Sequence, residues 1–182
     1  MTTAFARRLG AAAVAGLAGV ASMVGGVDAA GAQTQPNACG LLTQNDAKKI
    51  LGKTVRRETN LAGAQATSCS YVVAGDAKRL VGLGVGAFPS ADEAANAYTR
   101  ARANAQFDGL KIENVRKLGD RAHYVPKTNN FERTVSSKKL AFGELTVLDG
   151  QVVYTAFVTP PSKSKASDAI KSAIGRSHRR PA

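Results

Sequence analysis

The spacing of apolar and polar residues predicts most of the secondary structure between residues 41 and 175. Apolar residues recur with helical spacing in three segments, which are about residues 43–51, 90–106 and 164–175. An extended stretch begins at Val55, and apolar runs predict strands at 67–74, 79–88, 110–116, 122–125, 138–148 and 151–158. The predicted order is a helix, three strands, a helix, about four strands and a final helix.

Capping residues mark the ends of the first two helices. Thr43 is placed to cap the first helix, Asp46 suits its positive N-terminal end, and Gly52 ends it. Ser90 and Glu93 have the spacing of a capping box at the start of the longest helix. These residues support the helix predictions independently of the apolar spacing.

Three glycines alternate with apolar residues inside the strand 79–88, at Gly82, Gly84 and Gly86. A dinucleotide-binding glycine loop follows a strand and opens a helix, so the context here is wrong for it. We interpret the glycines as a bare face of the sheet, where the sheet bends or another group packs closely.

The dipeptide Asp149-Gly150 between two apolar runs predicts a hairpin with a two-residue turn. This turn predicts the cross-strand pairs Val147 with Val152, Leu145 with Tyr154, Gly143 with Ala156, and Ala141 with Val158. Strands joined by hairpins favour an antiparallel sheet. We therefore predict an α+β fold, in which an antiparallel sheet of about six or seven strands carries about three helices packed mainly on one face, as a two-layer sandwich.

The first 32 residues have the three-part pattern of a secretory signal. Arg7 and Arg8 precede an apolar run rich in Ala and Gly, and small residues follow at 30–32. The alternative is a transmembrane anchor, but the run is shorter than the roughly 20 strongly apolar residues that span a bilayer. We expect cleavage after Ala32, a polar lead-in at 33–38, one domain at 39–175 and a basic flexible tail at 176–182. The expected location is secreted, periplasmic or at the cell envelope, with no transmembrane segment in the mature chain.

The mature chain is strongly basic. Removal of the leader leaves 23 basic and 12 acidic residues, a net charge of +11. Such a charge favours anionic partners or serves solubility alone. Base recognition usually adds stacking aromatic residues, which make up only 5% of this chain, so we expect no specific nucleic-acid binding. The candidate contacts for an anionic partner are Lys138, Lys139, Arg179 and Arg180.

Two cysteines are present, Cys39 and Cys69, and both lie in the mature part. Two cysteines in an oxidising compartment most often pair, so we expect a structural disulfide. The alternative is a redox or nucleophilic thiol, but the chain has no CxxC motif and neither cysteine has a nearby histidine in sequence.

Catalytic and metal sites find little support in the sequence. His123 lies near Asp120 and Tyr124, which suggests a general base, but strand alternation places His123 and Tyr124 on opposite faces and no nucleophile is indicated. We interpret His123 as a surface or edge residue. The only other histidine is His178, and two histidines with two paired cysteines do not supply a zinc site. We therefore assign no catalytic, metal-binding or cofactor-binding residue, and we expect no cofactor.

Short motifs resemble a recurring pattern in secreted bacterial domains. They are the segment 39–43 (Cys-Gly-Leu-Leu-Thr), Leu51-Gly52, the segment 69–71 (Cys-Ser-Tyr), the segment 88–90 (Phe-Pro-Ser) and the turn 118–122. This pattern is similar to small exported domains and lipoproteins of actinobacteria and related high-GC bacteria, many known only as domains of unknown function. The extracellular sensor domains of some mycobacterial kinases are similar in layout. The resemblance implies a paired Cys39 and Cys69 and an α+β sandwich, and it implies no reaction; the lipid-bearing cysteine of the lipoprotein members is missing here.

These observations lead us to expect a monomeric, non-enzymatic binding or interaction module. Its partner would be an anionic envelope polymer, a lipid or another exported protein. The alternative is a small secreted hydrolase or an inhibitor of a secreted enzyme. A polar cluster in a pocket would favour an enzyme, and a rigid exposed loop at 126–133 would favour an inhibitor.

Overall fold

The computed structural model describes residues 36–58, 68–128, 134–135 and 138–179. The leader expected at residues 1–32, the first half of the expected lead-in (33–35) and Arg180 lie outside the described residues. Within the described ranges, no helix is long and apolar enough to cross a membrane.

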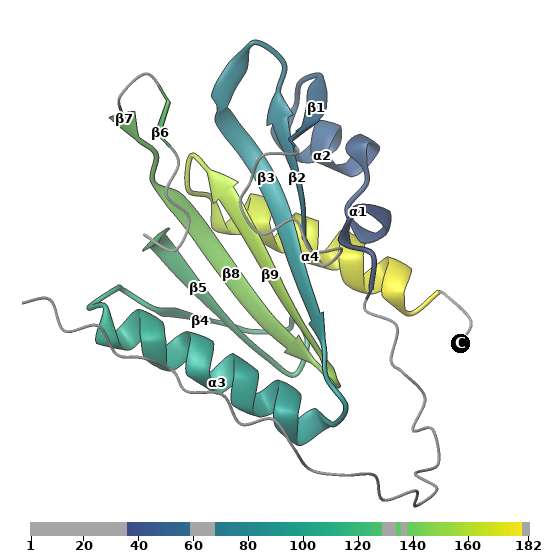
Figure 1. Ribbon diagram of the computed structural model, residues 1–182, viewed down its shortest axis with the longest axis vertical. Helices are drawn as coiled ribbons and strands as arrows, with labels where there is room; N and C mark the ends of the chain where they lie inside the picture. Colours follow the sequence, from purple (N-terminus) through teal and green to yellow (C-terminus); the bar gives the residue numbers. More distant parts are fainter. Residues whose placement is uncertain (1–35, 59–67, 129–133, 136–137, 180–182) are drawn as a thin grey trace, which may run out of the picture. The chain divides into compact units, whose positions relative to one another are not determined.

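Seven antiparallel strands form one open sheet with the order β1-β2-β3-β9-β8-β5-β4 (Figure 1). The strands of this sheet are β1 (Val55–Glu58), β2 (Ser68–Val73), β3 (Asp76–Ala87), β4 (Glu113–Val115), β5 (Arg121–Thr128), β8 (Phe142–Asp149) and β9 (Val152–Thr159). Two further strands, β6 (Thr134–Val135) and β7 (Lys138–Lys139), pair with each other in a separate ribbon. The predicted α+β class and its antiparallel sheet are therefore confirmed.

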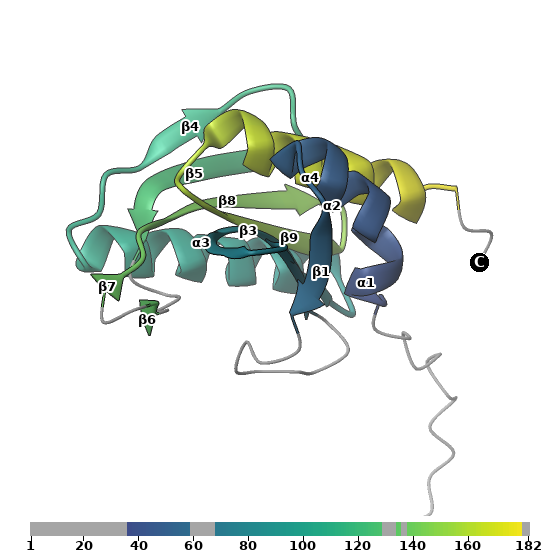
Figure 2. The same ribbon diagram turned by 90° about the horizontal axis from the view of Figure 1, so that it is seen from above.

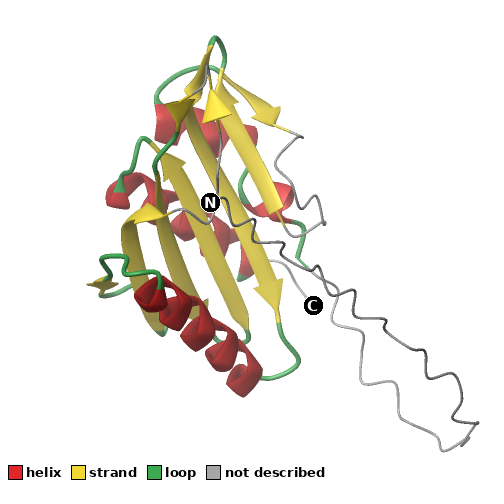
Figure 3. Ribbon diagram, turned by 60° about the vertical axis from the view of Figure 1, so that its left-hand side comes forward, coloured by secondary structure: helices red, strands yellow, loops and turns green. Residues whose placement is uncertain are grey.

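Helices cover both faces of this sheet (Figures 2 and 3). Three of them, α1 (Ala38–Leu41), α2 (Gln44–Leu51) and α4 (Lys163–Ser177), share one face, on which the main apolar core lies. The fourth, α3 (Ala91–Phe107), packs on the opposite face against residues of β8 and β9. Because α3 joins β3 to β4 at the far edge of the sheet, it crosses a face that the other helices leave uncovered.

The predicted ends of α2 and the predicted start of α3 are confirmed. Thr43 and Asp46 form a reciprocal capping box at the start of α2, and Gly52 ends the helix in the left-handed region at φ 70°. Ser90 accepts a hydrogen bond from the backbone N–H of Glu93 at the start of α3. The short helix α1, which is capped by the side chain of Asn37, was not predicted.

The glycine face of β3 is packed closely, as we predicted. Val81 and Leu83 point into the main core, and Gly82 lies on the other face. A Cβ atom at Gly82 would come within 2.1 Å of the ring of Phe157, its partner on β9. The missing side chain at Gly82 therefore makes room for the buried ring of Phe157.

The predicted register of the β8–β9 hairpin was wrong. Asp149 pairs with Val152, so the two-residue turn is Gly150-Gln151 and not Asp149-Gly150. Gly150 has a φ of 57° at the first turn position, whereas the sequence suggested a turn with its glycine second. Every predicted partner therefore shifts by two residues, as in the observed pair Val147 with Tyr154. The assignment of residues to faces is unchanged, because a shift by two preserves the alternation.

Strand β5 is longer than we predicted. It continues through Pro126 to Thr128, and its pairing with β8 is irregular between Val125 and Thr128. Proline has no N–H to donate, and an irregular register is where a sheet tolerates it. The loop that we predicted at 126–133 therefore begins after Thr128, three residues later than predicted. Residues 129–133 lie outside the described part of the chain.

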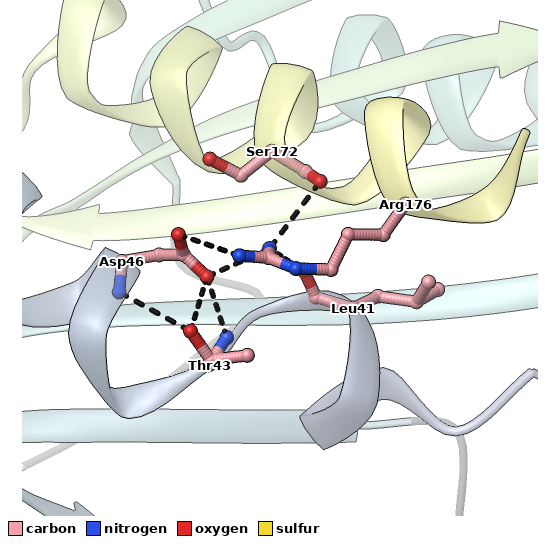
Figure 4. Close-up of polar contacts among 5 residues, drawn as sticks. All are labelled: Leu41, Thr43, Asp46, Ser172 and Arg176. Atoms are coloured by element: carbon pink, nitrogen blue, oxygen red, sulfur yellow. Dashed lines mark hydrogen bonds and ion pairs between the residues drawn. The ribbon is translucent and has the colours of Figure 1, made fainter. Parts of the chain in front are cut away.

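The last helix is also longer than we predicted, which places Arg176 in the domain and not in the tail. The guanidinium of Arg176 donates to the backbone oxygen of Leu41 at 2.8 Å and contacts both carboxylate oxygens of Asp46, at 2.7 and 2.8 Å (Figure 4). Burial raises the pKa of Asp46, but the hydrogen bonds from Arg176 and Thr43 outweigh it and hold that pKa below its ordinary value. This network ties α4 to α1 and α2.

Replacement of Arg176 by Met should lower the free energy of unfolding by about 1–2 kcal/mol at pH 7, because Asp46 would lose its charged partner. The difference from the wild type should shrink below about pH 4, because a carboxylate with a lowered pKa stabilises the fold only while it is ionised. Urea denaturation at pH 7 and pH 3 measures both effects. The matched control is Lys171→Met on the exposed side of α4, and equal losses in the two variants would contradict a specific role for Arg176.

Candidate functional site

A hollow of about 420 Å³ lies between α3, the edge strand β4 and its neighbour β5. We call it the α3–β5 cleft, and it is lined by Tyr98, Thr99, Arg102, Asn114, Val115, Asp120, Arg121 and Ala122. Its volume is in the range of pockets that hold small ligands. The cleft is therefore large enough for a small organic ligand.

The helix and the strands place the cleft residues by their regular spacing. Tyr98 and Arg102 are one turn apart on α3, so both side chains project from the same side of the helix. Arg121 and His123 are two residues apart on β5 and share a sheet face, and β4 places Asn114 opposite His123. The cleft thus forms where α3 crosses the edge of the sheet.

Two arginines contribute positive charge to the cleft. The guanidinium of Arg102 donates to the side-chain oxygen of Asn114 at 2.8 Å, and that of Arg121 lies 5.2 Å from the centre of the Tyr98 ring. Burial raises the pKa of Tyr98, and the charges of Arg102 and Arg121 offset part of the rise. Within the described residues, neither guanidinium forms an ion pair with a carboxylate, so both charges remain unpaired there.

Among the described residues, Asp120 is the one carboxylate that lines the cleft, and it is bound to a backbone group. Its Oδ2 atom accepts a hydrogen bond from the backbone N–H of Gly150 at 2.8 Å. Its own N–H donates to the carbonyl of Leu148, also at 2.8 Å. Asp120 therefore fastens the rim of the cleft to the β8–β9 hairpin.

His123 lies beneath Tyr98 and is buried, with 1% of its surface exposed. The two rings meet edge to face with their centres 5.0 Å apart. Burial, with a smaller contribution from the charge of Arg102, lowers the pKa of His123 to about 4, so the ring is neutral at pH 7. The interpretation of His123 as a surface or edge residue was wrong, because β4 and α3 cover its strand. Its placement on the face opposite Tyr124 is confirmed.

A buried polar row continues from His123 across the sheet. Thr146 on β8 is the cross-strand partner of His123 and donates to the carboxylate of Glu144 at 3.4 Å. Both residues are buried. The Nδ1 atom of His123 is buried without a hydrogen-bond partner.

The residues singled out from the sequence lie in separate parts of the structure. Cys39 in α1 and Cys69 in β2 form the predicted disulfide, with their Cα atoms 5.0 Å apart. Lys138 and Lys139 form β7, of which only the backbone is described, and Arg179 is exposed just beyond α4. The fourth candidate contact, Arg180, lies outside the described ranges, so the grouping of these four residues around an anion stays a prediction.

The sequence did not lead us to predict that Arg102 and Arg121 line the same cleft. One signal was available, because Tyr98 and Arg102 have the spacing of neighbours on a helix. The approach of Arg121 depends on α3 crossing the second face of the sheet, which no local pattern reveals. In the described residues, no three side chains of the types His, Cys, Asp and Glu come together as a metal site would require.

Comparison with known proteins adds no further assignment. No protein-family model matches the chain, and no curated protein matches it significantly.

Proposed function

We propose that this protein is an exported binding module whose ligand carries negative charge. The observation that carries this proposal is the pair of arginines in the α3–β5 cleft, which have no carboxylate partner among the described residues. Unpaired guanidiniums beside a hollow favour an anionic ligand over a neutral one. The net charge of +11 expected for the mature chain would also attract polyanions from a distance.

Export is supported by two independent features. The first 32 residues have the pattern of a cleavable signal, and the two cysteines of the chain form a disulfide. Structural disulfides persist mainly outside the cytoplasm, because cytoplasmic thiols are kept reduced. Together these features favour a secreted or cell-envelope location.

The alternative of a secreted hydrolase has weaker support. The cleft does have polar residues beside a buried histidine, which is the feature that would favour an enzyme. A hydrolase also needs a nucleophile or an activated water next to its base, and His123 is shielded by Tyr98. A binding role needs only the charges that the cleft already presents.

The test uses the mature chain, residues 33–182, with its disulfide intact. It should sediment with bacterial cell walls that retain their anionic polymers, and about 0.5 M salt should release it, because salt screens charge interactions. Walls stripped of those polymers are the control and should retain much less protein. Retention that is indifferent to salt, or equal on stripped walls, would contradict an anionic ligand.

A second experiment tests export, and for it the full chain is produced with residues 1–32. The protein recovered outside the cytoplasm should begin at Gln33, and its intact mass should correspond to an oxidised pair of cysteines. Recovery of the uncleaved chain inside the cell would oppose the proposal.

A further inference from the structure

We propose that the α3–β5 cleft binds a phosphate monoester, with Arg102 and Arg121 as the two residues that hold the phosphate group. This inference rests on the proposed function, because it names the chemical class of the anionic ligand and the site that receives it. It goes beyond overall charge, because it assigns binding to two particular guanidiniums.

Arg102 and Arg121 bring many hydrogen-bond donors to the cleft. Each guanidinium carries five N–H groups in a rigid fork. Arg102 donates a hydrogen bond across the cleft to Asn114 and also hydrogen-bonds to the side chain of Tyr98. Arg121 lies over the Tyr98 ring, and among the described residues neither arginine forms an ion pair. Two such forks are matched better by an acceptor with more than two oxygens. A phosphate monoester presents three terminal oxygens, whereas a carboxylate presents two, which a single fork satisfies.

The second argument is charge. A phosphate monoester carries about two negative charges near neutral pH, which match the two guanidiniums. The carboxylate of Asp120 lies at the rim, where it is bound to the N–H of Gly150, and it forms no ion pair with Arg102 or Arg121. Asp120 repels any anion in the cleft, but the two guanidiniums outweigh it, so the net attraction is larger for a dianion than for a singly charged anion.

The third argument is shape and rigidity. A phosphate group fills only part of a hollow of about 420 Å³, so the organic part of the ester has room beside the phosphate. The Tyr98 ring is fixed between the guanidinium of Arg121 and the edge of the His123 ring. Arg121 therefore stacks on an aromatic ring that is itself held in place, which limits the ordering that binding requires.

The decisive variant replaces both arginines, as Arg102→Gln with Arg121→Gln. The matched control is Lys48→Gln with Lys49→Gln, which removes the same charge from a hollow of about 430 Å³ beside α2. Glycerol 3-phosphate is the soluble probe, and vesicles containing phosphatidic acid present the same monoester on a lipid. Thermal unfolding of each variant confirms that it is folded before its binding is measured by calorimetry or by vesicle sedimentation.

The arginine variant should bind the monoester at least about tenfold more weakly than the wild type, because each charge-assisted hydrogen bond is strong. The lysine variant should change the affinity less than about twofold, because long-range charge is screened. Binding of glycerol 3-phosphate alone identifies a soluble ester as the source, and binding to the vesicles alone identifies a lipid. Either result supports the site, provided that it depends on the two arginines.

A third variant tests the role that charge plays inside the cleft. Asp120→Asn keeps an oxygen that can accept from Gly150 and removes the negative charge, so it should strengthen monoester binding.

In nuclear magnetic resonance spectra at pH 7, the ring signals of His123 should shift on addition of the monoester, because the ligand would neutralise the nearby charge of Arg102. A change in His123 that persists in the double arginine variant would argue against this site.

The inference and the proposed function can fail separately. No monoester binding by the wild type, or equal loss in the arginine and lysine variants, overturns the inference. If the wild type still binds anionic cell walls with salt sensitivity, the proposed function survives that result. If instead the arginines govern monoester binding while cell walls are not bound, the site stands and the wall-binding function fails.

Discussion

Removal of the Cys39–Cys69 disulfide is expected to lower the free energy of unfolding by about 3.5 kcal/mol, the largest effect that we predict. The bridge joins residues that are 30 apart in sequence, and a cross-link of that length removes much of the freedom of the unfolded chain. It also holds α1 against β2, the strand that follows β1 in the sheet. A loss of this size is a large share of the roughly 5–15 kcal/mol that stabilises a typical domain.

The measurement is urea denaturation of the double variant Cys39→Ala with Cys69→Ala, compared with the wild type. Wild-type protein kept in reductant is the control, and its curve should agree with that of the variant. A shift below about 1 kcal/mol in both samples would show that packing of α1 holds the structure without the bridge. The expected result would make the fold depend on an oxidising compartment, which links stability to the proposed export.

His123 should make the protein less stable as the pH falls from about 6.5 to about 4, by about 3 kcal/mol in total. Its folded pKa is about 4, because burial disfavours the charged ring, and an unfolded histidine has a pKa of about 6.5. Above pH 6.5 the ring is neutral in both states. Below it, the unfolded chain takes up the proton first, so unfolding becomes easier as the pH falls.

Replacement of His123 by Leu should remove this dependence between pH 6.5 and pH 4. The variant should be at least as stable as the wild type at pH 7, because the buried Nδ1 atom has no hydrogen-bond partner to lose. Denaturation curves at several pH values measure the slope, and His178→Gln, at the exposed end of α4, is the control. A His123→Leu variant that keeps the full slope would assign it to other groups.

Local patterns predicted much of the fold because their causes are local. The capping box of α2, the alternation of β3 and the apolar side of α4 depend on residues a few positions apart. The pairing of Cys39 with Cys69 followed from their number and from the expected compartment. Each of these predictions needed no knowledge of which strands are neighbours.

Other features were missed because they depend on contacts across the chain. In the β8–β9 turn, Gly150 takes the first turn position. Its backbone N–H donates a hydrogen bond to the carboxylate of Asp120, which lies 30 residues away in sequence. We predicted that Arg176 belongs to the tail, but it binds Leu41 and Asp46, which are 135 and 130 residues away in sequence. A sequence pattern does not contain such distant acceptors.

The candidate site shows the same division. The helical spacing of Tyr98 and Arg102, and the strand spacing of Arg121 and His123, are readable in the sequence. The burial of His123 is not, because it depends on β4 pairing at the sheet edge and on α3 packing over the ring. For that reason the sequence suggested an exposed histidine and offered no pair of arginines.

The sequence by itself thus determined the class of the fold, the ends of α2 and the start of α3, the alternation of its strands, the cysteine pair and the sign of the charge. Only the tertiary structure decided which face α3 covers, the register of the last hairpin, the place of Arg176 and the formation of the α3–β5 cleft. The physical reason is that capping and periodicity act between neighbours along the chain, whereas burial and charge pairing depend on which distant segments pack together.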